Sequence, residues 1–138
     1  MKPTATSVAW VFAASFYAAA AIGFIPNPLL GPDGLFVANT AHNFVHLLTG
    51  VGFTVVALAG SRASVVFMQA FAVIYALTGV IGFLATGLGG EGHLLGLVHL
   101  NTLDNFLHLG LGAVIGVAGW YLHGRSASVR LSPTIHQG

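Results

Sequence analysis

Two segments of the chain place histidine, asparagine and aspartate at helical spacing. Residues 39–50 read NTAHNFVHLLTG and residues 101–112 read NTLDNFLHLGLG, so the second copy follows the first by 62 residues. Within each copy the polar side chains recur three and four residues apart, and they therefore share one face of a helix. Each copy offers two metal-ligand types one turn apart, His42 with His46 and Asp104 with His108.

Three imidazoles and one carboxylate are ligands that Zn²⁺, Cu²⁺ and Fe²⁺ accept. Side chains at positions i and i+4 of a helix stand about 6 Å apart, which suits the binding of one ion. We therefore predict a site for one transition-metal ion (Zn, Cu or Fe). Asn43 and Asn105 would hold the imidazoles in the ligating tautomer. The predicted ligands are His42, His46, Asp104 and His108.

Two other interpretations use the same residues. Asn39 and Asn101 stand where helix N-caps stand, and Asn101 with Asp104 is typical of a capping box. Capping leaves His46 and His108 unexplained, and ionisable residues within a membrane are functional candidates. These two histidines would also suit the axial ligation of a haem, or the ligation of a pigment magnesium.

The elements that position these residues must be membrane helices. Only 5% of the 138 residues are charged and 56% are hydrophobic, whereas a soluble domain has about 25% charged residues. This composition excludes a soluble fold and a nucleic-acid-binding protein. With no cysteine there is no disulfide and no thiolate metal site.

Four segments have the length of about 20 mostly apolar residues that crosses a bilayer. They cover residues 7–25, 41–60, 63–86 and 103–123. We therefore expect one all-α transmembrane domain over residues 1–138, with a flexible tail at 125–138.

Charged residues predict the orientation of these spans. Lys2 precedes span one, and Arg62 lies between spans two and three. Arg125 and Arg130 follow span four. Asp33 and Glu91 lie in the other two connections. Because basic residues stay on the cytoplasmic side, we expect both termini in the cytoplasm and the motifs near the outer face. A bacterial inner membrane is the expected location.

Small residues indicate where helices approach closely. Gly112, Gly116 and Gly119 form a stripe below the second motif, and Gly50 ends the first motif. We expect spans two and four to pack together through these glycines. Because the repeat covers two spans, we also expect two tandem helical hairpins related by an axis along the membrane normal.

The doubled pattern NxxHNxxHxxxG and NxxDNxxHxxxG, at residues 37–50 and 100–112, resembles a known family. It is that of small four-helix bacterial membrane proteins catalogued as domain of unknown function 4383. The resemblance extends over all four spans. It implies the fold and the twofold repeat, and it supplies no mechanism.

The leading hypothesis is a metal-binding or accessory membrane protein. The alternatives are a structural subunit that docks on a larger membrane complex or on further copies of itself, and a haem- or pigment-binding protein. No catalytic nucleophile is evident, so we do not expect an enzyme. Glu91, His93 and His99 precede the second motif. These residues could lie over the site, but their spacing does not require it, and we expect them to be solvated residues of the loop.

Overall fold

A computed structural model describes residues 3–131, with side chains described up to residue 124. The four spans are helices α1 (Ala5–Gly23), α2 (Thr40–Ala59), α3 (Ser61–Thr86) and α4 (Thr102–Leu131). In this described part, each helix is long and apolar enough to cross a membrane. The expectation of a multi-pass membrane protein built from four helices is confirmed at this level.

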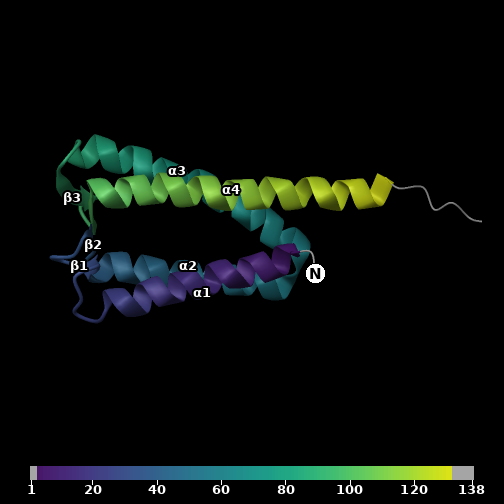
Figure 1. The fold of residues 1–138 in the computed structure, drawn as a ribbon, viewed down its shortest axis with the longest axis horizontal. Helices are drawn as coiled ribbons and strands as arrows, with labels where there is room; N and C mark the ends of the chain where they lie inside the picture. Colours follow the sequence, from purple (N-terminus) through teal and green to yellow (C-terminus); the bar gives the residue numbers. More distant parts are fainter. Residues whose placement is uncertain (1–2, 132–138) are drawn as a thin grey trace, which may run out of the picture.

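The helices form two pairs (Figure 1). α1 lies along α2, and α3 lies along α4. The chain passes from the first pair to the second at Gly60, whose φ of 105° is accessible to glycine but strained for other residues. Because Gly60 alone separates α2 from α3, the second pair begins where the first one ends.

The glycines of α4 face α3, whereas we expected them to face α2. Gly112 lies against the backbone of Ala72 and Ala76, and Gly116 and Gly119 lie against the preceding turns of α3. α2 and α4 are not a closely packed pair. Small residues are needed where two backbones approach, and here the closest approach is between the two helices of one pair.

Gly50 has the corresponding place in the first pair. It lies against the ring of Tyr17 in α1, and a Cβ at this glycine would overlap that ring. The Tyr17 hydroxyl then reaches Thr54 on α2 at 3.0 Å. Gly50 therefore allows α2 to pack closely on α1. It does not bring α2 into close contact with α4.

The last helix is longer than expected. We expected it to end near His123 at Gly124, but α4 continues to Leu131. A glycine ends a helix when it adopts the left-handed conformation, and Gly124 is not among the described glycines with positive φ. A glycine inside a helix costs only about 1 kcal/mol relative to alanine. The remainder of the expected flexible tail, 132–138, lies outside the described residues.

The connections between α1 and α2 and between α3 and α4 contain short strands, which the sequence patterns did not predict. β1 (Leu30–Gly31) and β2 (Phe36–Val37) are parallel, and β3 (Glu91–Leu94) and β4 (Val98–Asn101) form an antiparallel hairpin. Figure 1 shows all of them at the end of the bundle opposite the N-terminus and the end of α4. These strands cover the helix ends at that end of the bundle.

An aromatic cluster joins the two helix pairs in the middle of the bundle. The Phe16 ring of α1 lies 5.7 Å from that of Phe53 and 5.9 Å from that of Phe71 on α3. Phe53 also contacts Phe67 at 4.9 Å. Such ring pairs contribute about 0.5–1.5 kcal/mol beyond the burial of their surface. The cluster fixes the distance between the two helix pairs. Phe16 and Tyr75, in contact with each other, are its members nearest the strands.

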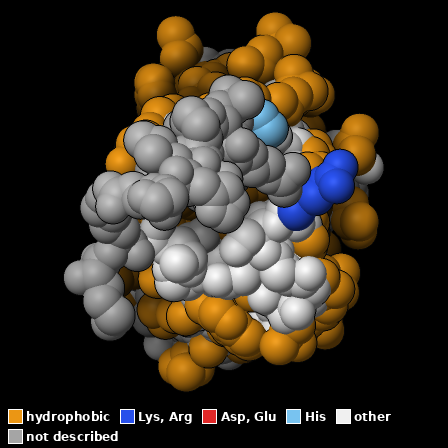
Figure 2. Space-filling view, turned by 90° about the vertical axis from the view of Figure 1, so that its right-hand side faces the viewer, with side chains coloured by type: hydrophobic (Ala, Val, Ile, Leu, Met, Phe, Trp, Pro, Cys, Tyr) orange, Lys and Arg blue, Asp and Glu red, His pale blue; other side chains and the backbone are white. Residues whose placement is uncertain are grey.

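The two ends of the bundle differ in charge. Figure 2 shows the end that carries the N-terminus and the end of α4, where basic side-chain atoms are visible and no acidic ones are seen among the described atoms. Asp33 and Glu91 lie at the other end, in the α1–α2 and α3–α4 connections, and both are exposed. Among the described side chains, Arg62 at the start of α3 is therefore at the opposite end of the bundle from these two acids.

A glycine exchange tests the packing of α4 on α3. Gly112→Ala should destabilise the protein by about 1–3 kcal/mol, because its Cβ would stand 2.9 Å from the Ala76 backbone nitrogen. Gly110→Ala is the matched control: no atom lies within 4 Å of its Cβ, and alanine gains up to about 1 kcal/mol in a helix. The thermal midpoint in detergent measures both. Equal midpoints for the two variants would contradict the packing described.

Candidate functional site

The two repeated segments begin with helix caps. The side-chain oxygen of Asn39 accepts a hydrogen bond from the His42 backbone at 3.0 Å, and that of Asn101 accepts one from the Asp104 backbone at 3.0 Å. Asp104 Oδ2 in turn accepts from the Asn101 backbone at 2.9 Å, which completes a capping box. These bonds satisfy donors that every helix N-terminus leaves free.

The same two asparagines form hydrogen bonds to the α1–α2 and α3–α4 connections. Asn39 Nδ2 donates to the Leu97 carbonyl at 2.8 Å, and Asn101 Nδ2 donates to the Leu35 carbonyl at 3.0 Å. Leu35 and Leu97 are 62 residues apart, as are the two asparagines. Each connection is therefore held by the cap of the other pair.

The second asparagine of each segment locks its helix to the neighbouring helix. Asn43 Nδ2 donates to the Gly23 carbonyl at 2.7 Å, and Asn105 Nδ2 donates to Thr86 Oγ1 at 3.0 Å. The oxygen of each amide lies where a Cβ would stand on Gly23 or Gly82, and it has no conventional hydrogen-bond partner. It therefore faces a glycine Cα–H, a weak donor that recurs where helices pack closely.

His42 and His108 each hold one ring nitrogen against a backbone carbonyl. His42 Nδ1 lies 2.9 Å from the His99 oxygen, and His108 Nδ1 lies 2.6 Å from the Asp104 oxygen. Because a carbonyl oxygen only accepts, Nδ1 carries the hydrogen in both rings. Nε2 of the neutral ring then keeps a lone pair, which is the arrangement found in metal-ligating histidines.

His46 lacks such an anchor. Its side chain is 8% exposed, and its Nδ1 is buried with no hydrogen-bond partner. The ring centroid lies 4.6 Å from that of His42 and 6.0 Å from that of Phe16. A buried polar atom left unpaired costs about 1–3 kcal/mol, so this nitrogen is an energetic liability unless something binds it.

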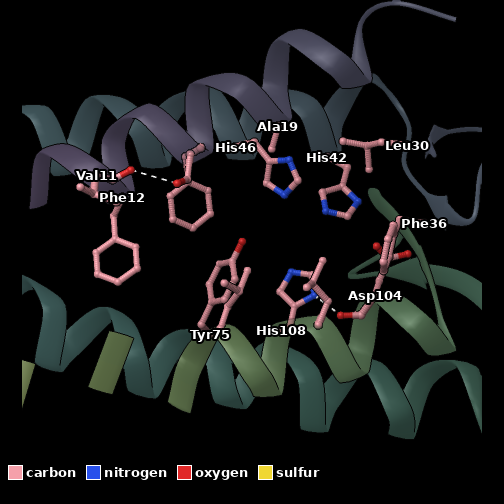
Figure 3. A pocket seen from close by; sticks show the side chains of 14 residues that line it. Val11, Phe12, Ala19, Leu30, Phe36, His42, His46, Tyr75, Asp104 and His108 are labelled. Carbon is pink, nitrogen blue, oxygen red and sulfur yellow. Dashed lines mark hydrogen bonds between the residues drawn. The ribbon is translucent and has the colours of Figure 1, made fainter. Parts of the chain in front are cut away.

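One cavity of about 220 Å³ brings the predicted residues together (Figure 3). His42 and His46 reach it from α2, and Asp104 and His108 from α4 on the other side. All four predicted ligands thus line one space between the helix pairs. The remaining walls are almost entirely apolar: Val11, Phe12, Ser15, Phe16, Ala19, Leu30, Phe36, Tyr75, Leu107 and Leu111.

Asp104 contributes least to the chemistry of this cavity. Its Oδ2 already accepts from the Val37 backbone at 3.0 Å as well as from Asn101, so this oxygen is committed to the fold. In the described part of the chain, no group of three or more His, Cys, Asp or Glu side chains is arranged to hold a metal ion. The transition-metal site stays a prediction, as does haem or pigment binding.

Sequence reasoning missed Tyr75 of α3. Its ring lies 4.7 Å from that of His108, and Figure 3 shows its hydroxyl directed toward His46. Among the described residues this hydroxyl has no hydrogen-bond partner. The available signal was a phenol in the middle of an apolar span, where a hydroxyl usually requires a partner.

The loop histidines lie above the site. His93 and His99 stack at 4.4 Å on the β3–β4 hairpin, and the His99 backbone holds His42 in place. Glu91 begins the same hairpin and is exposed. Their side chains do not line the cavity, so the hairpin acts on the site through its backbone.

A family model described as a domain of unknown function (DUF4383) matches residues 6–121. The chain belongs to this family. No curated protein and no solved structure matches the chain. The DUF4383 match includes both repeated segments and every residue that lines the cavity, so the site lies within the DUF4383 domain.

Replacement of Asp104 tests its structural role. Asp104→Ala should cost about 2–4 kcal/mol, because the capping box loses the acceptor of the Asn101 N–H, at about 0.5–2 kcal/mol, and the Val37 N–H loses its partner, at about 1–3 kcal/mol. Asp33→Ala, in the exposed part of the first connection, is the control. Thermal midpoints should show the difference with and without a chelator. If Asp104→Ala lowers the thermal midpoint only in the absence of the chelator, Asp104 stabilises the protein by binding a metal ion instead.

Proposed function

We propose that this membrane protein binds a small ligand in the cavity between its two helix pairs, with His46 as the central polar contact. The observation that carries the proposal is the buried Nδ1 of His46, which has no partner. Polar groups at membrane depth are costly, and they persist where they pair or where function needs them. His46 lines the cavity, so a rotation of its ring would turn this nitrogen toward a ligand and recover the lost hydrogen bond.

The neighbouring side chains support the same proposal. His42 and His108 have ring centroids 5.9 Å apart, and Nε2 of each ring is the nitrogen not used by the fold. The Tyr75 hydroxyl adds a donor. Small-molecule sites combine apolar walls with a few polar groups in this way. A structural subunit without a ligand of its own would leave these groups unexplained.

A transition-metal ion is the second candidate for the ligand. The anchoring of His42 and His108 through Nδ1 favours it, because this bond fixes the ligating tautomer. The double use of Asp104 Oδ2 by the backbone argues against it. A haem or pigment is less well supported, because about 220 Å³ is small even for a drug-sized ligand.

The proposal also includes the orientation and the repeat. We place both termini in the cytoplasm of a bacterium, with the strands outside its inner membrane, and this is supported by the sequence positions of the four basic residues and by Arg62 at the start of α3. The tandem relation of the helix pairs is supported by the exchanged bonds of Asn39 and Asn101. Docking on a larger complex or on a second copy stays a prediction.

Labelling of single cysteines tests the orientation without background, because the chain has no cysteine. Asp33→Cys and Glu91→Cys should react with an impermeant maleimide in intact cells, whereas Arg62→Cys should react only after lysis. All three positions are exposed, so accessibility within the protein does not bias the comparison. Labelling of position 62 in intact cells would reverse the orientation.

The ligand proposal is tested by what the purified protein carries. Protein isolated in mild detergent should show a bound mass by native mass spectrometry, and His46→Leu should lose it. The unliganded His46→Leu variant should be at least as stable as the wild type, since it removes an unpaired polar atom worth about 1–3 kcal/mol. Elemental analysis of the same samples identifies a metal as about one ion per chain.

His123→Leu is the matched control, because His123 is exposed and lies far along α4 from the cavity. It should keep whatever the wild type carries. If wild type and His46→Leu carry the same molecules in the same amounts, the proposed function is wrong and the cavity is only a packing defect.

A further inference from the structure

The cavity reaches the surface of the bundle on its membrane side. Val11 of α1 and Leu107 of α4 both line it, and they are 64% and 43% exposed. α1 and α4 make little contact with each other. Both residues lie within helices that cross the membrane, so this opening faces lipid hydrocarbon.

The end of the cavity toward the outer surface is more tightly closed. Leu30 and Phe36, which line it there, are only partly exposed, and Asp104 binds the backbone of β2. The exchanged bonds of Asn39 and Asn101 hold the two connections together above it. A ligand therefore enters from the bilayer, and it must be soluble in lipid.

The size of the cavity limits the part of the ligand that enters. A cavity of about 150 Å³ accepts benzene, so about 220 Å³ accommodates one six-membered ring with a few substituents. Phe12, Phe16, Phe36 and Tyr75 supply aromatic walls for such a ring. An alkyl tail would remain between α1 and α4, in the hydrocarbon.

The polar groups define what the ring must carry. His42 and His108 use their Nδ1 hydrogens on carbonyls, so each presents an Nε2 lone pair that accepts a hydrogen bond. His46 Nδ1 has no partner but is itself buried, so it meets a ligand only after the ring turns. The Tyr75 hydroxyl, on a residue that lines the cavity, is a donor and an acceptor. Two or more acceptors around one ring match hydroxyl substituents better than carbonyl oxygens, which offer no hydrogen.

From these four observations we infer that the cavity binds the ring of a lipid-soluble hydroquinone, a dihydroxylated ring on an alkyl tail. This inference rests on the proposed function and names the ligand class. The imidazoles accept hydrogen bonds from the ring hydroxyls, and the Tyr75 hydroxyl bonds to a ring oxygen. The tail extends past Val11 and Leu107 into the membrane.

The test uses decylhydroquinone, kept reduced without oxygen, and purified protein freed of bound molecules in detergent micelles. Decylhydroquinone should bind saturably, as measured by quenching of protein fluorescence and by a rise in the thermal midpoint. Its dimethyl ether, which has the same ring and tail but no hydroxyl hydrogen, should bind at least tenfold more weakly, because two hydrogen bonds are lost. Equal binding of the ether would overturn the inference.

Variants locate the binding in the cavity. His46→Leu and Tyr75→Phe should each weaken decylhydroquinone binding by about three- to tenfold, the effect of one hydrogen bond. Tyr75→Phe keeps the ring, so it tests the inference even if His46→Leu folds poorly. Val11→Trp should block the membrane opening, whereas Val117→Trp, 72% exposed and remote from the cavity, should not. Unchanged binding in all three cavity variants would also overturn the inference.

The inference and the proposed function fail separately. If decylhydroquinone does not bind but His46→Leu loses another copurified molecule or an ion, the hydroquinone is wrong and the ligand site stands. If decylhydroquinone does not bind and His46→Leu carries the same molecules as the wild type, both are wrong.

Discussion

A polar group inside hydrocarbon has no water to bond to, and only the protein itself can supply its partner. The doubled segment of this chain places eight Asn, His and Asp side chains at the N-terminal ends of α2 and α4. Most of them are paired, and most of the pairings join two elements. Asn39 and Asn101 bond the connections, Asn43 and Asn105 bond the neighbouring helix, and Asp104 bonds β2.

This requirement also explains how the helices are paired. Asn43 reaches the Gly23 carbonyl only because Gly23 has no side chain, and Asn105 fits against Gly82 for the same reason. The asparagines therefore hold α2 on α1 and α4 on α3. Because the asparagine hydrogen bonds lie within each helix pair, they do not fill the space between the pairs. That space contains the aromatic cluster and, nearer the strands, the cavity.

Sequence patterns predicted the features that follow from local spacing. Four long apolar runs can only be membrane helices, and the i, i+4 spacing placed His42, His46, Asp104 and His108 on faces that line one cavity. The partners of those faces could not be predicted, because a glycine stripe indicates close packing without naming the neighbour. The strands were missed since two- and four-residue strands in Gly- and Pro-rich connections have too little periodicity to recognise. Tyr75 was missed because it has no counterpart in the repeat.

Among the Asn, His and Asp positions, the two copies of the segment differ only where His42 in the first copy corresponds to Asp104 in the second. His42 donates to the carbonyl of residue 99, and Asp104 accepts from the N–H of residue 37, which stands 62 residues earlier. The same position of the fold is thus fastened by a donor in one copy and by an acceptor in the other. A histidine in place of aspartate at position 42 thus adds an imidazole to the cavity and still makes the hydrogen bond to the connection of the other helix pair.

His46 and His108 occupy equivalent positions, yet only one of them is satisfied by its own helix. His108 donates to the carbonyl four residues earlier, whereas His46 makes no corresponding bond to residue 42 and leaves Nδ1 unpaired. A structural role would have favoured the satisfied rotamer, or a leucine, at both positions. The His46 ring instead lies between His42 and the Tyr75 hydroxyl, at the side of the cavity that faces the second helix pair. The fold thus accepts the cost of one unpaired nitrogen on a ring that lines the cavity.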